Sequence, residues 1–453
     1  MKFNYYINAN CFLVRKGALF ALALVIFSAK LVAQIDSGYT TIDTSYNRID
    51  TTYNREEIDF NGYLARVGSS NLGYAAQKLN INIAQAQIEL AKIFPDPQIY
   101  IGNFNNGQQR LQSGYGAVIS INRTVELGGK RKARINLANS EKELAIALLV
   151  DYFRNLRADA TNDFLQALKE KSTLTVKLNS YDKMKQLADA NQMRFELGSA
   201  MEIDAVQSKV EAEMLMNEVI QTDADLKAAL AQLAMWLGKQ NGDTLYFPLG
   251  DMRNSEREFD LQSLITTAQN NRADVLAALK NKEVAQKALK LAKANRVLDM
   301  NVMVNNGYYS RISNIIEPTP SYNSIGGGIS VPLKFSNRLQ GELKMAETQI
   351  KQADVLYQTV ELQIAVDVTQ AYYQYKAAQR KIQQFNLQLL EQSRKVLEGK
   401  IYSYQRGATS LLEVLNARRT YNEIQLAYYE TLLNYSSSLV ELERSAGIWD
   451  INF

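Results

Sequence analysis

Two carboxylates occupy equivalent positions in this 453-residue chain, because Asp204 and Glu413 each lie six residues after a glycine, Gly198 and Gly407. Repeated around a narrow axis in an assembly of several copies, they would form rings that favour cations and repel anions. Crowded carboxylates would also raise one another's pKa. The alternative is helix capping, since each glycine is followed closely by Ser-x-x-Glu, the pattern of a capping box. Both interpretations stay open.

The residue inventory argues against catalysis and metal binding. The chain has no histidine, and its single cysteine, Cys11, allows no intrachain disulfide. The sequence contains no phosphate-binding loop, nucleophile–base pair or metal-ligand cluster, so we expect no enzyme and no cofactor. Without the four basic residues that precede position 34, the chain has 47 basic and 47 acidic residues. This balance argues against nucleic acid as a partner.

The N-terminal segment, 1–33, has the order of a secretory signal peptide. Basic Arg15-Lys16 is followed by an apolar run from Ala18 to Phe27, and cleavage is expected after Ala33. The alternative is a membrane anchor, but a spanning helix needs roughly 20 apolar residues. Residues 34–59 are polar and repetitive, so we expect an extended or disordered arm. No later segment has the composition of a membrane-spanning helix.

Most of the chain is written twice, the second copy about 209 residues after the first. This duplication predicts structural repeats at 60–238 and 260–447, a linker at 239–259 and a tail at 448–453. Each repeat should contain a helix, a strand pair and an antiparallel hairpin of long helices. The hairpins should turn at the two glycines that precede the carboxylates.

Two stretches predict unusually long helices. Residues 130–197 contain neither proline nor glycine and, at about 1.5 Å per residue, predict a helix on the order of 100 Å long. The matching stretch, 338–406, is interrupted only by Gly341 and Gly399. Such helices need neighbours against which their apolar stripes can pack.

A pair of short strands precedes each long helix, at 98–122 and 300–331. In the second strand of each pair, apolar or small residues lie on one face: Tyr115, Ala117, Ile119 and Ile121 in one copy, and Ile325, Gly327, Ile329 and Val331 in the other. Their expected partners and the Asn/Gly-rich loops that join each pair lie at 98–101, 102–114, 300–305 and 306–323.

Four such strands cannot complete a barrel. If their apolar face meets lipid, unpaired edges are forbidden, so the sheet must close, and only further copies of the chain can supply strands. The membrane interpretation therefore requires an oligomer. The alternative is a small soluble sheet that caps a helical bundle.

This order of elements resembles the TolC-type outer-membrane efflux proteins, in their CzcC-like heavy-metal efflux branch, over nearly all of the chain after the arm. The resemblance also rests on Leu-Ala-Lys-Ile-Phe-Pro-Asp-Pro, which ends at Pro97, and on Val-Glu-Leu-Gly-Gly-Lys-Arg after the following strand. Its most specific carriers are the two turns, Phe195-x-x-Gly198 and Tyr404-x-x-Gly407, at fixed spacing inside the duplication.

The resemblance implies a mainly α protein with a membrane β-barrel. It would be a homotrimer with a twelve-stranded barrel in the outer membrane of a Gram-negative bacterium and a twelve-helix α-barrel in the periplasm. The implied function is the passive exit duct of a tripartite efflux pump for small molecules or metal cations. The implied partners are a periplasmic adaptor (membrane fusion) protein, an inner-membrane RND-type pump and outer-membrane lipid. The linker and the chain ends would form an equatorial belt.

The resemblance also assigns site residues. The periplasmic gate would be formed by Phe195, Gly198, Asp204, Gln207, Tyr404, Gly407, Glu413 and Asn416. The surface that meets the adaptor would consist of Ser199, Ala200, Ala408 and Thr409. Tyr404 matches a tyrosine that helps to lock the closed turn in the family, whereas Phe195 lacks the hydroxyl. Asn416 stands where family members often have an acid, which argues against a double acidic ring.

Two alternative functions stay open. The same tube could serve as the exit duct of a type I protein secretion system, or the chain could be a secreted coiled-coil structural protein without a pore. Membrane extraction distinguishes the second alternative, because a duct would be a heat-sensitive trimer in the outer-membrane fraction. An enzyme is the least favoured class.

Overall fold

The computed structural model of the chain describes residues 54–453 except 106–113, 240–243, 253–256, 334–338 and Asn386. The expected signal peptide and most of the expected arm therefore lie outside the described residues. None of the helices in these described ranges is both long and apolar enough to span a membrane.

The described elements repeat along the chain. The first half contains β1 (Asn54–Asp59), α2 (Phe60–Ser70), α3 (Leu72–Lys92), β2 (Gln98–Asn105), β3 (Tyr115–Val125), α4 (Lys130–Glu196) and α5 (Glu202–Trp236). The second contains β4 (Thr244–Leu249), α6 (Leu261–Asn271), α7 (Ala273–Asn295), β5 (Met300–Tyr309), β6 (Tyr322–Ser330), α8 (Gln340–Gln384), α9 (Leu387–Gln405) and α10 (Leu411–Ala446). Helix α6 corresponds to α2 and helix α10 to α5, so the predicted duplication is present in the structure.

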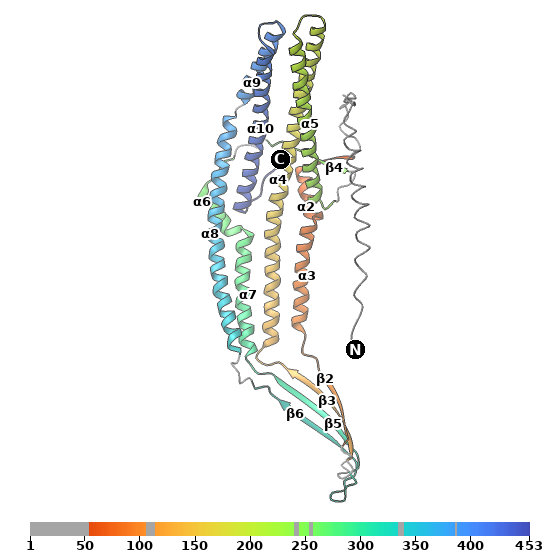
Figure 1. The fold of residues 1–453 in the computed structure, drawn as a ribbon. Helices are drawn as coiled ribbons and strands as arrows, with labels where there is room; N and C mark the ends of the chain where they lie inside the picture. The colour runs from red at the N-terminus through yellow and green to blue at the C-terminus, as the bar shows by residue number, and fades with distance from the viewer. Residues whose placement is uncertain (1–53, 106–113, 240–243, 253–256, 334–338, 386) are drawn as a thin grey trace, which may run out of the picture. The chain divides into compact units, whose positions relative to one another are not determined.

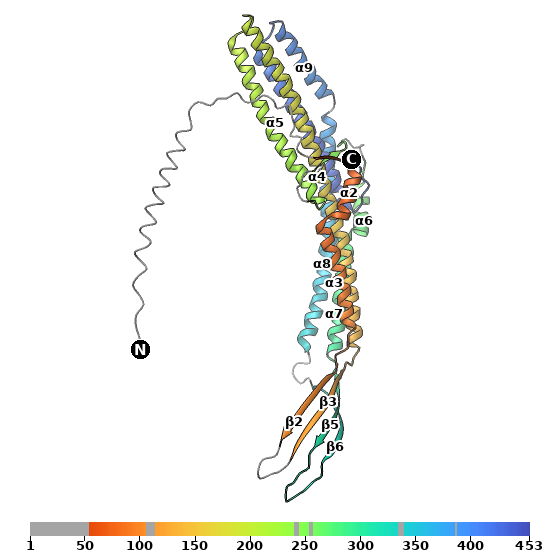
Figure 2. The ribbon, with the colours of Figure 1, turned by 90° about the vertical axis from the view of Figure 1, so that its right-hand side faces the viewer.

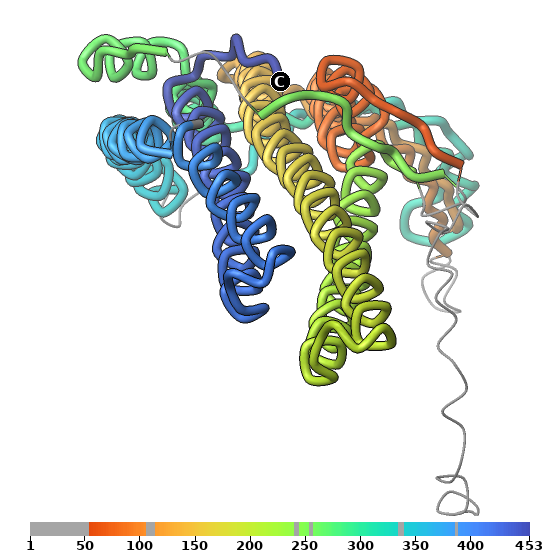
Figure 3. Tube along the Cα trace, turned by 90° about the horizontal axis from the view of Figure 1, so that it is seen from above, coloured from red at the N-terminus to blue at the C-terminus, as the bar shows by residue number. Residues whose placement is uncertain are grey.

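The strands and the helices attached to them lie in the same order. The strands form one sheet in the order β2-β3-β5-β6, with every pair antiparallel. The helices pack in the order α3, α4, α7 and α8 (Figure 1). Farther from the sheet, α5, α4, α10 and α9 stand side by side (Figure 3). Together these helices form one layer. The sheet lies at one end of the layer, and both hairpin turns lie at the other (Figure 2).

One face of the sheet is apolar and exposed. Its isoleucines are all more than half exposed: Ile99, Ile101, Ile119, Ile121, Ile325 and Ile329. The register places them on one face, since Ile101 pairs with Ile119, and Ile119 and Ile325 both pair with Asn306. The predicted alternation of apolar residues is therefore present in the described strands.

The strands β2 and β5 are four residues longer than the sequence predicts. They continue into segments expected as loops, where Gly102–Asn105 pairs with Tyr115–Val118. Glycine and asparagine weaken an isolated strand, but here the neighbouring strand satisfies their backbone groups. Strand β6 likewise begins earlier than expected, at Tyr322.

The long helices differ between the two repeats. Helix α4 is continuous over 67 residues, as predicted. The expected helix at 338–406 is instead divided, because α8 ends at Gln384 and α9 begins at Leu387, whereas Gly341 and Gly399 both lie within helices. The Phe385 ring lies at this division, 6.3 Å from the ring of Tyr428 on α10.

The linker and the described chain ends meet beside α4. Strands β1 and β4 pair in parallel. The Phe60 ring lies 5.5 Å from the ring of Phe164 on α4 and 5.2 Å from that of Phe453. These rings belong to the main apolar core, and the resulting contact fixes residues 448–453 against the long helices.

A buried carboxylate ties the C-terminal tail to α10. The Glu443 side chain is fully buried, its Oε1 accepts from Arg257 at 2.5 Å, and its Oε2 accepts from the Asp450 backbone N–H at 3.0 Å. The Arg257 guanidinium also pairs with the Asp450 carboxylate at 2.6 Å. Burial, followed by the neighbouring Asp450, raises the pKa of Glu443 to about 7.

This raised pKa predicts a pH-dependent stability. Because the folded protein keeps the Glu443 proton to a higher pH than the unfolded chain does, the stabilisation present at pH 5 is lost as pH rises through about 7. We expect the unfolding temperature to fall by a few °C, as an order of magnitude, between pH 5 and pH 8. Calorimetry of Glu443→Gln should show a smaller fall. Exposed Glu423→Gln on the same helix is the control, and an equal pH response in both variants would contradict this assignment.

Candidate functional site

Both hairpin turns have the same backbone structure. Gly198 and Gly407 adopt left-handed conformations with φ of 72° and 73°. The Gly198 N–H donates to the Phe195 carbonyl at 2.8 Å, and the Gly407 N–H donates to the Tyr404 carbonyl at 2.9 Å. A Cβ at either glycine would meet nothing within 4 Å. The turns therefore need glycine for its backbone conformation and not for space.

Tyr404 joins the two repeats next to these turns. Its hydroxyl donates to Asn191 Oδ1 on α4 at 3.1 Å, and both side chains are buried. Burial, followed by the negative charge of Asp204, raises the pKa of the Tyr404 hydroxyl. The Tyr404 ring packs in a small apolar cluster with Met184, Leu411, Val414 and Leu415, among others. The second turn is thus anchored to the helices of the first repeat.

Phe195 and Tyr404 occupy equivalent positions but different environments. Phe195 is 37% exposed and Tyr404 only 6%. Phe195 has no hydroxyl with which to reach a buried acceptor, and Asp204, in the first turn of α5, is half-buried. Of these two equivalent positions, only the one in the second repeat therefore places a tyrosine hydroxyl in the interior.

The capping boxes that the sequence left open as an alternative do not form. Helix α5 has Met201 as its N-cap, and the Ser199 hydroxyl donates instead to the Arg194 carbonyl at 3.0 Å. Ser410 is the N-cap of α10, but its side chain makes no capping hydrogen bond. Ser199 lies too far before the helix to cap it, because α5 begins three residues later.

Glu413 pairs with a base across the second turn. Its Oε2 contacts Nζ of Lys400 on α9, and this contact lowers the pKa of Glu413. Within one chain this direction is opposite to that expected from crowded carboxylates. The Lys400 ammonium offsets the charge of the Glu413 carboxylate. In a single chain Glu413 is therefore ion-paired.

The remaining predicted residues lie at the same end of the helices. Gln207, Asn416, Ser199 and Ala408 are exposed, whereas Ala200 and Thr409 are half-buried. Together with the residues above they lie at the ends of α4, α5, α9 and α10 and in the two turns, opposite the sheet (Figures 1 and 2). The structure therefore brings the predicted gate and adaptor-facing residues to one end of the chain.

Sequence reasoning missed Lys400 and Asn191. Lys400 could have been found, because it lies seven residues before Gly407 and Glu413 lies six after it. Residues at nearly equal distances from an antiparallel turn face each other. Asn191 carries no comparable signal. Its contact with Tyr404 depends on how the first hairpin packs against the second.

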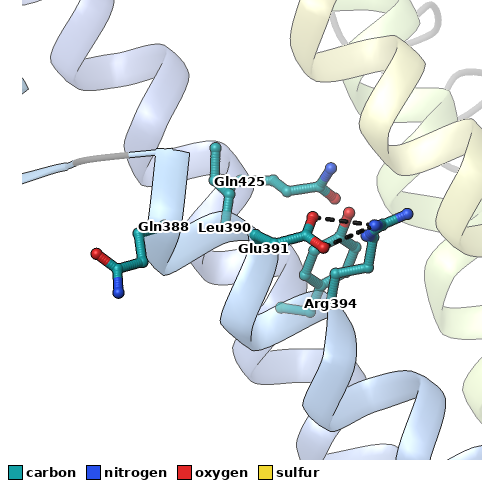
Figure 4. A pocket seen from close by; sticks show the side chains of 6 residues that line it. Gln388, Leu390, Glu391, Arg394 and Gln425 are labelled. Carbon is teal, nitrogen blue, oxygen red and sulfur yellow. Dashed lines mark hydrogen bonds and ion pairs between the residues drawn. The ribbon is translucent and has the colours of Figure 1, made fainter.

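A pocket elsewhere lacks the features of a catalytic site. It has a volume of about 520 Å³ and lies between α9 and α10 (Figure 4). Both Glu391 oxygens accept from Arg394 at 2.9 Å, so the charged groups of the pocket are already paired. Among the residues that the structure describes, no cluster of three or more Cys, Asp or Glu side chains could hold a metal ion.

Comparisons with known proteins agree with this architecture. Residues 264–448 match the outer membrane efflux protein family. The cobalt-zinc-cadmium resistance protein CzcC of Cupriavidus metallidurans is 21% identical over 385 residues, which cover 85% of this chain and 88% of CzcC. The outer membrane protein VceC of Vibrio cholerae has a TM-score of 0.65 at 18% identity, with 85% of this chain and 95% of VceC covered. The CmeC outer membrane channel of Campylobacter jejuni has a TM-score of 0.66 at 15% identity, with 85% of each chain covered.

The duplicated helical hairpins, the four-stranded antiparallel sheet and the paired glycine turns define the fold of a TolC-type channel subunit. The sequence matches agree with that fold. Residues 264–448 belong to the outer membrane efflux protein family, and the chain as a whole resembles TolC-type channels in sequence and fold.

Proposed function

We propose that this outer-membrane efflux duct is a homotrimer that releases metal cations from a tripartite pump and is gated at the paired helix turns. The observation that carries the proposal is that the helices of one chain form a single layer with apolar residues exposed along both edges. The end of this layer opposite the sheet contains the Tyr404–Asn191 hydrogen bond. The duct performs no chemistry, so its partners must supply the energy for transport.

The edges of the layer support an assembly of several copies. The strand order leaves the outer edges of β2 and β6 without partners in the described sheet. On the helices attached to these two strands, α3 exposes Leu72 and Leu79, and α8 exposes Val355 and Leu362. Each pair is spaced by seven residues, the spacing of a coiled-coil seam. The α8 edge of one copy can therefore join the α3 edge of the next, a head-to-tail contact that closes into a ring.

The helices nearer the turns repeat this arrangement. At one edge α5 exposes an apolar stripe of Ile203, Val206, Val210 and Met214. At the other edge α9 exposes Val396 and Tyr402. The layer therefore has apolar edges both next to the sheet and next to the turns. Three copies would supply twelve strands for a closed barrel.

The proposed cargo follows from the similarity to CzcC, whose name describes cobalt, zinc and cadmium resistance. A conduit needs no metal ligands, so the missing ligand cluster in the described residues does not oppose metal transport. The proposed partners are a periplasmic adaptor protein, which would meet the turns at Ser199, Ala200, Ala408 and Thr409, and an inner-membrane RND-type pump. The proposed gate consists of the residues around Tyr404, Asp204 and Glu413.

A valine at the second turn tests this function. Gly407→Val places a β-branched residue at φ 73°, which costs roughly 1–2 kcal/mol or more locally. Because a Cβ there has open space, the trimer should remain intact while the turn distorts. In a strain that lacks this gene but keeps the pump and adaptor, the variant should restore much less zinc, cobalt or cadmium resistance than the native gene.

Gly399→Val provides the matched control, because Gly399 lies inside α9, also with open space, and without a positive φ. This control should keep most of the resistance. Full resistance in the Gly407→Val strain, with normal amounts of trimer, would reject the assignment of the turn.

A further inference from the structure

A group of basic residues surrounds the junction between the sheet and the helices. Segments 92–97, 123–136 and 286–300 contain ten basic and three acidic residues, although the chain after residue 33 is balanced. They lie at the end of α3, at the beginning of α4 and at the end of α7, each next to a strand. We call this group the basic collar. Positive charge is therefore concentrated at one level of the molecule.

Two of the three acids in the basic collar are already paired. Asp299 binds Lys130 at 2.6 Å, and Glu126 binds Arg134 through both of its oxygens. The third acid, Asp96, is exposed. In the described part of the chain, no ion pair engages four lysines of the collar, which are Lys132, Lys287, Lys290 and Lys293. Lys287 lies close enough to Glu143 to help lower its pKa, but the collar as a whole carries an excess of positive charge.

Three of these lysines surround one pocket. Lys132 on α4 and Lys287 and Lys290 on α7 line it together with Gly128, Gly129 and Asn136. Its volume is about 180 Å³. This is enough for a phosphate group but less than a drug-sized ligand needs. Lysine binds phosphate as a point charge, so the pocket fits a small anionic group.

The basic collar also borders the apolar face of the sheet. Arg123 is exposed on that face, two residue pairs beyond the Ile121–Val304 pair toward the helices. The Arg131 guanidinium lies 4.3 Å from the centre of the exposed Phe94 ring. Bases and aromatic rings beside an apolar band are typical of the boundary between lipid tails and headgroups.

We propose that the basic collar binds the phosphate headgroups of anionic phospholipids in the leaflet next to the helices, with Lys132, Lys287 and Lys290 as its principal ligands. The inference rests on the proposed function, because it requires the apolar face of the sheet to lie in the membrane. The adjoining apolar face gives the acyl chains a surface, which a free phosphate ion would not need. Each lysine near an anionic lipid surface contributes roughly a fivefold gain in binding.

The test uses the purified full-length trimer and native mass spectrometry with equal amounts of phosphatidylglycerol and phosphatidylcholine. The native trimer should retain phosphatidylglycerol preferentially. The triple variant Lys132→Gln, Lys287→Gln, Lys290→Gln should lose that preference by on the order of 100-fold. The control variant Lys183→Gln, Lys185→Gln, Lys209→Gln removes the same charge near the hairpin turns and should keep the preference.

Three outcomes would overturn the inference: no preference in the native trimer, an equal loss in the control variant, or full competition by soluble glycerol 3-phosphate. The last outcome would identify the pocket as a site for free phosphate esters. Channel conductance of the native trimer in planar bilayers separates the two proposals. A conducting trimer without lipid preference contradicts only the lipid site, whereas absence of both trimer and channel contradicts the proposed function.

Discussion

Replacing Arg272 by Ala is expected to destabilise the protein by roughly 3–5 kcal/mol, because it removes one partner from a buried ion pair. The Arg272 side chain is only 5% exposed and pairs with Asp274 at 2.6 Å and with Asp367 at 3.2 Å. It also donates to the Ser445 carbonyl at 3.1 Å. One guanidinium thus links α7, α8 and α10. Without it, two partly buried carboxylates lose their shared cation.

The measurement is the unfolding free energy in detergent, supported by the temperature at which trimers dissociate. Arg419→Ala is the control, since Arg419 is exposed and its pair with Glu211 is long, at 3.5 Å. Exposed pairs contribute little, so this variant should resemble the native protein. Equal stability of the Arg272→Ala and native proteins would show that the buried cluster does not hold the second repeat together.

The second large effect is expected at the turns, where Tyr404→Phe should increase the open fraction of the channel. The substitution keeps the ring but leaves Asn191 Oδ1, which is buried, without its donor. An unsatisfied buried acceptor costs roughly 1–3 kcal/mol, which corresponds to a 5- to 150-fold shift between two states. Single-channel recording in planar bilayers should therefore show more frequent or larger openings.

Tyr402→Phe is the matched control for this experiment. Tyr402 lies on the same helix and loses the same hydroxyl, but its side chain is 54% exposed. Its conductance should remain native. Native conductance in the Tyr404→Phe channel as well would mean that the Tyr404–Asn191 hydrogen bond is a packing contact without a gating role.

Much of this fold could be predicted from local pattern. A stretch without proline or glycine identified α4 to within one residue of its end. The alternation of isoleucines with small and polar residues identified the exposed face of the sheet. The division between α8 and α9 could not be predicted, because no glycine or proline marks it in the sequence.

The candidate site was predictable to a similar degree. The positive φ at Gly198 and Gly407 could be predicted, because glycine commonly adopts it where a helix ends in a turn. The Lys400–Glu413 pair could be predicted from the positions of the two residues on either side of Gly407. The acceptor of the Tyr404 hydroxyl was not predictable. Asn191 lies on the other hairpin, far away in the sequence, and becomes a partner only when the two hairpins pack together.

The central claim, that copies of this chain join edge to edge into a closed trimer, can be tested by disulfide cross-linking in isolated outer membranes. Leu79 on α3 and Val355 on α8 are almost equally far along their helices from the ends next to the sheet, Lys92 and Gln340. Leu72 and Leu362 form a second pair, one heptad further along. Within one chain α4 and α7 separate α3 from α8, so the members of each pair cannot bond to each other.

The only natural cysteine, Cys11, lies in the expected signal peptide, so the introduced cysteines should be the only ones in the mature protein. After oxidation and heating, we expect at least one of the two double-cysteine variants to run as a covalent trimer on a non-reducing gel. Single-cysteine variants should run as monomers, or as dimers at most. Only monomers from both double variants would contradict the edge-to-edge assembly.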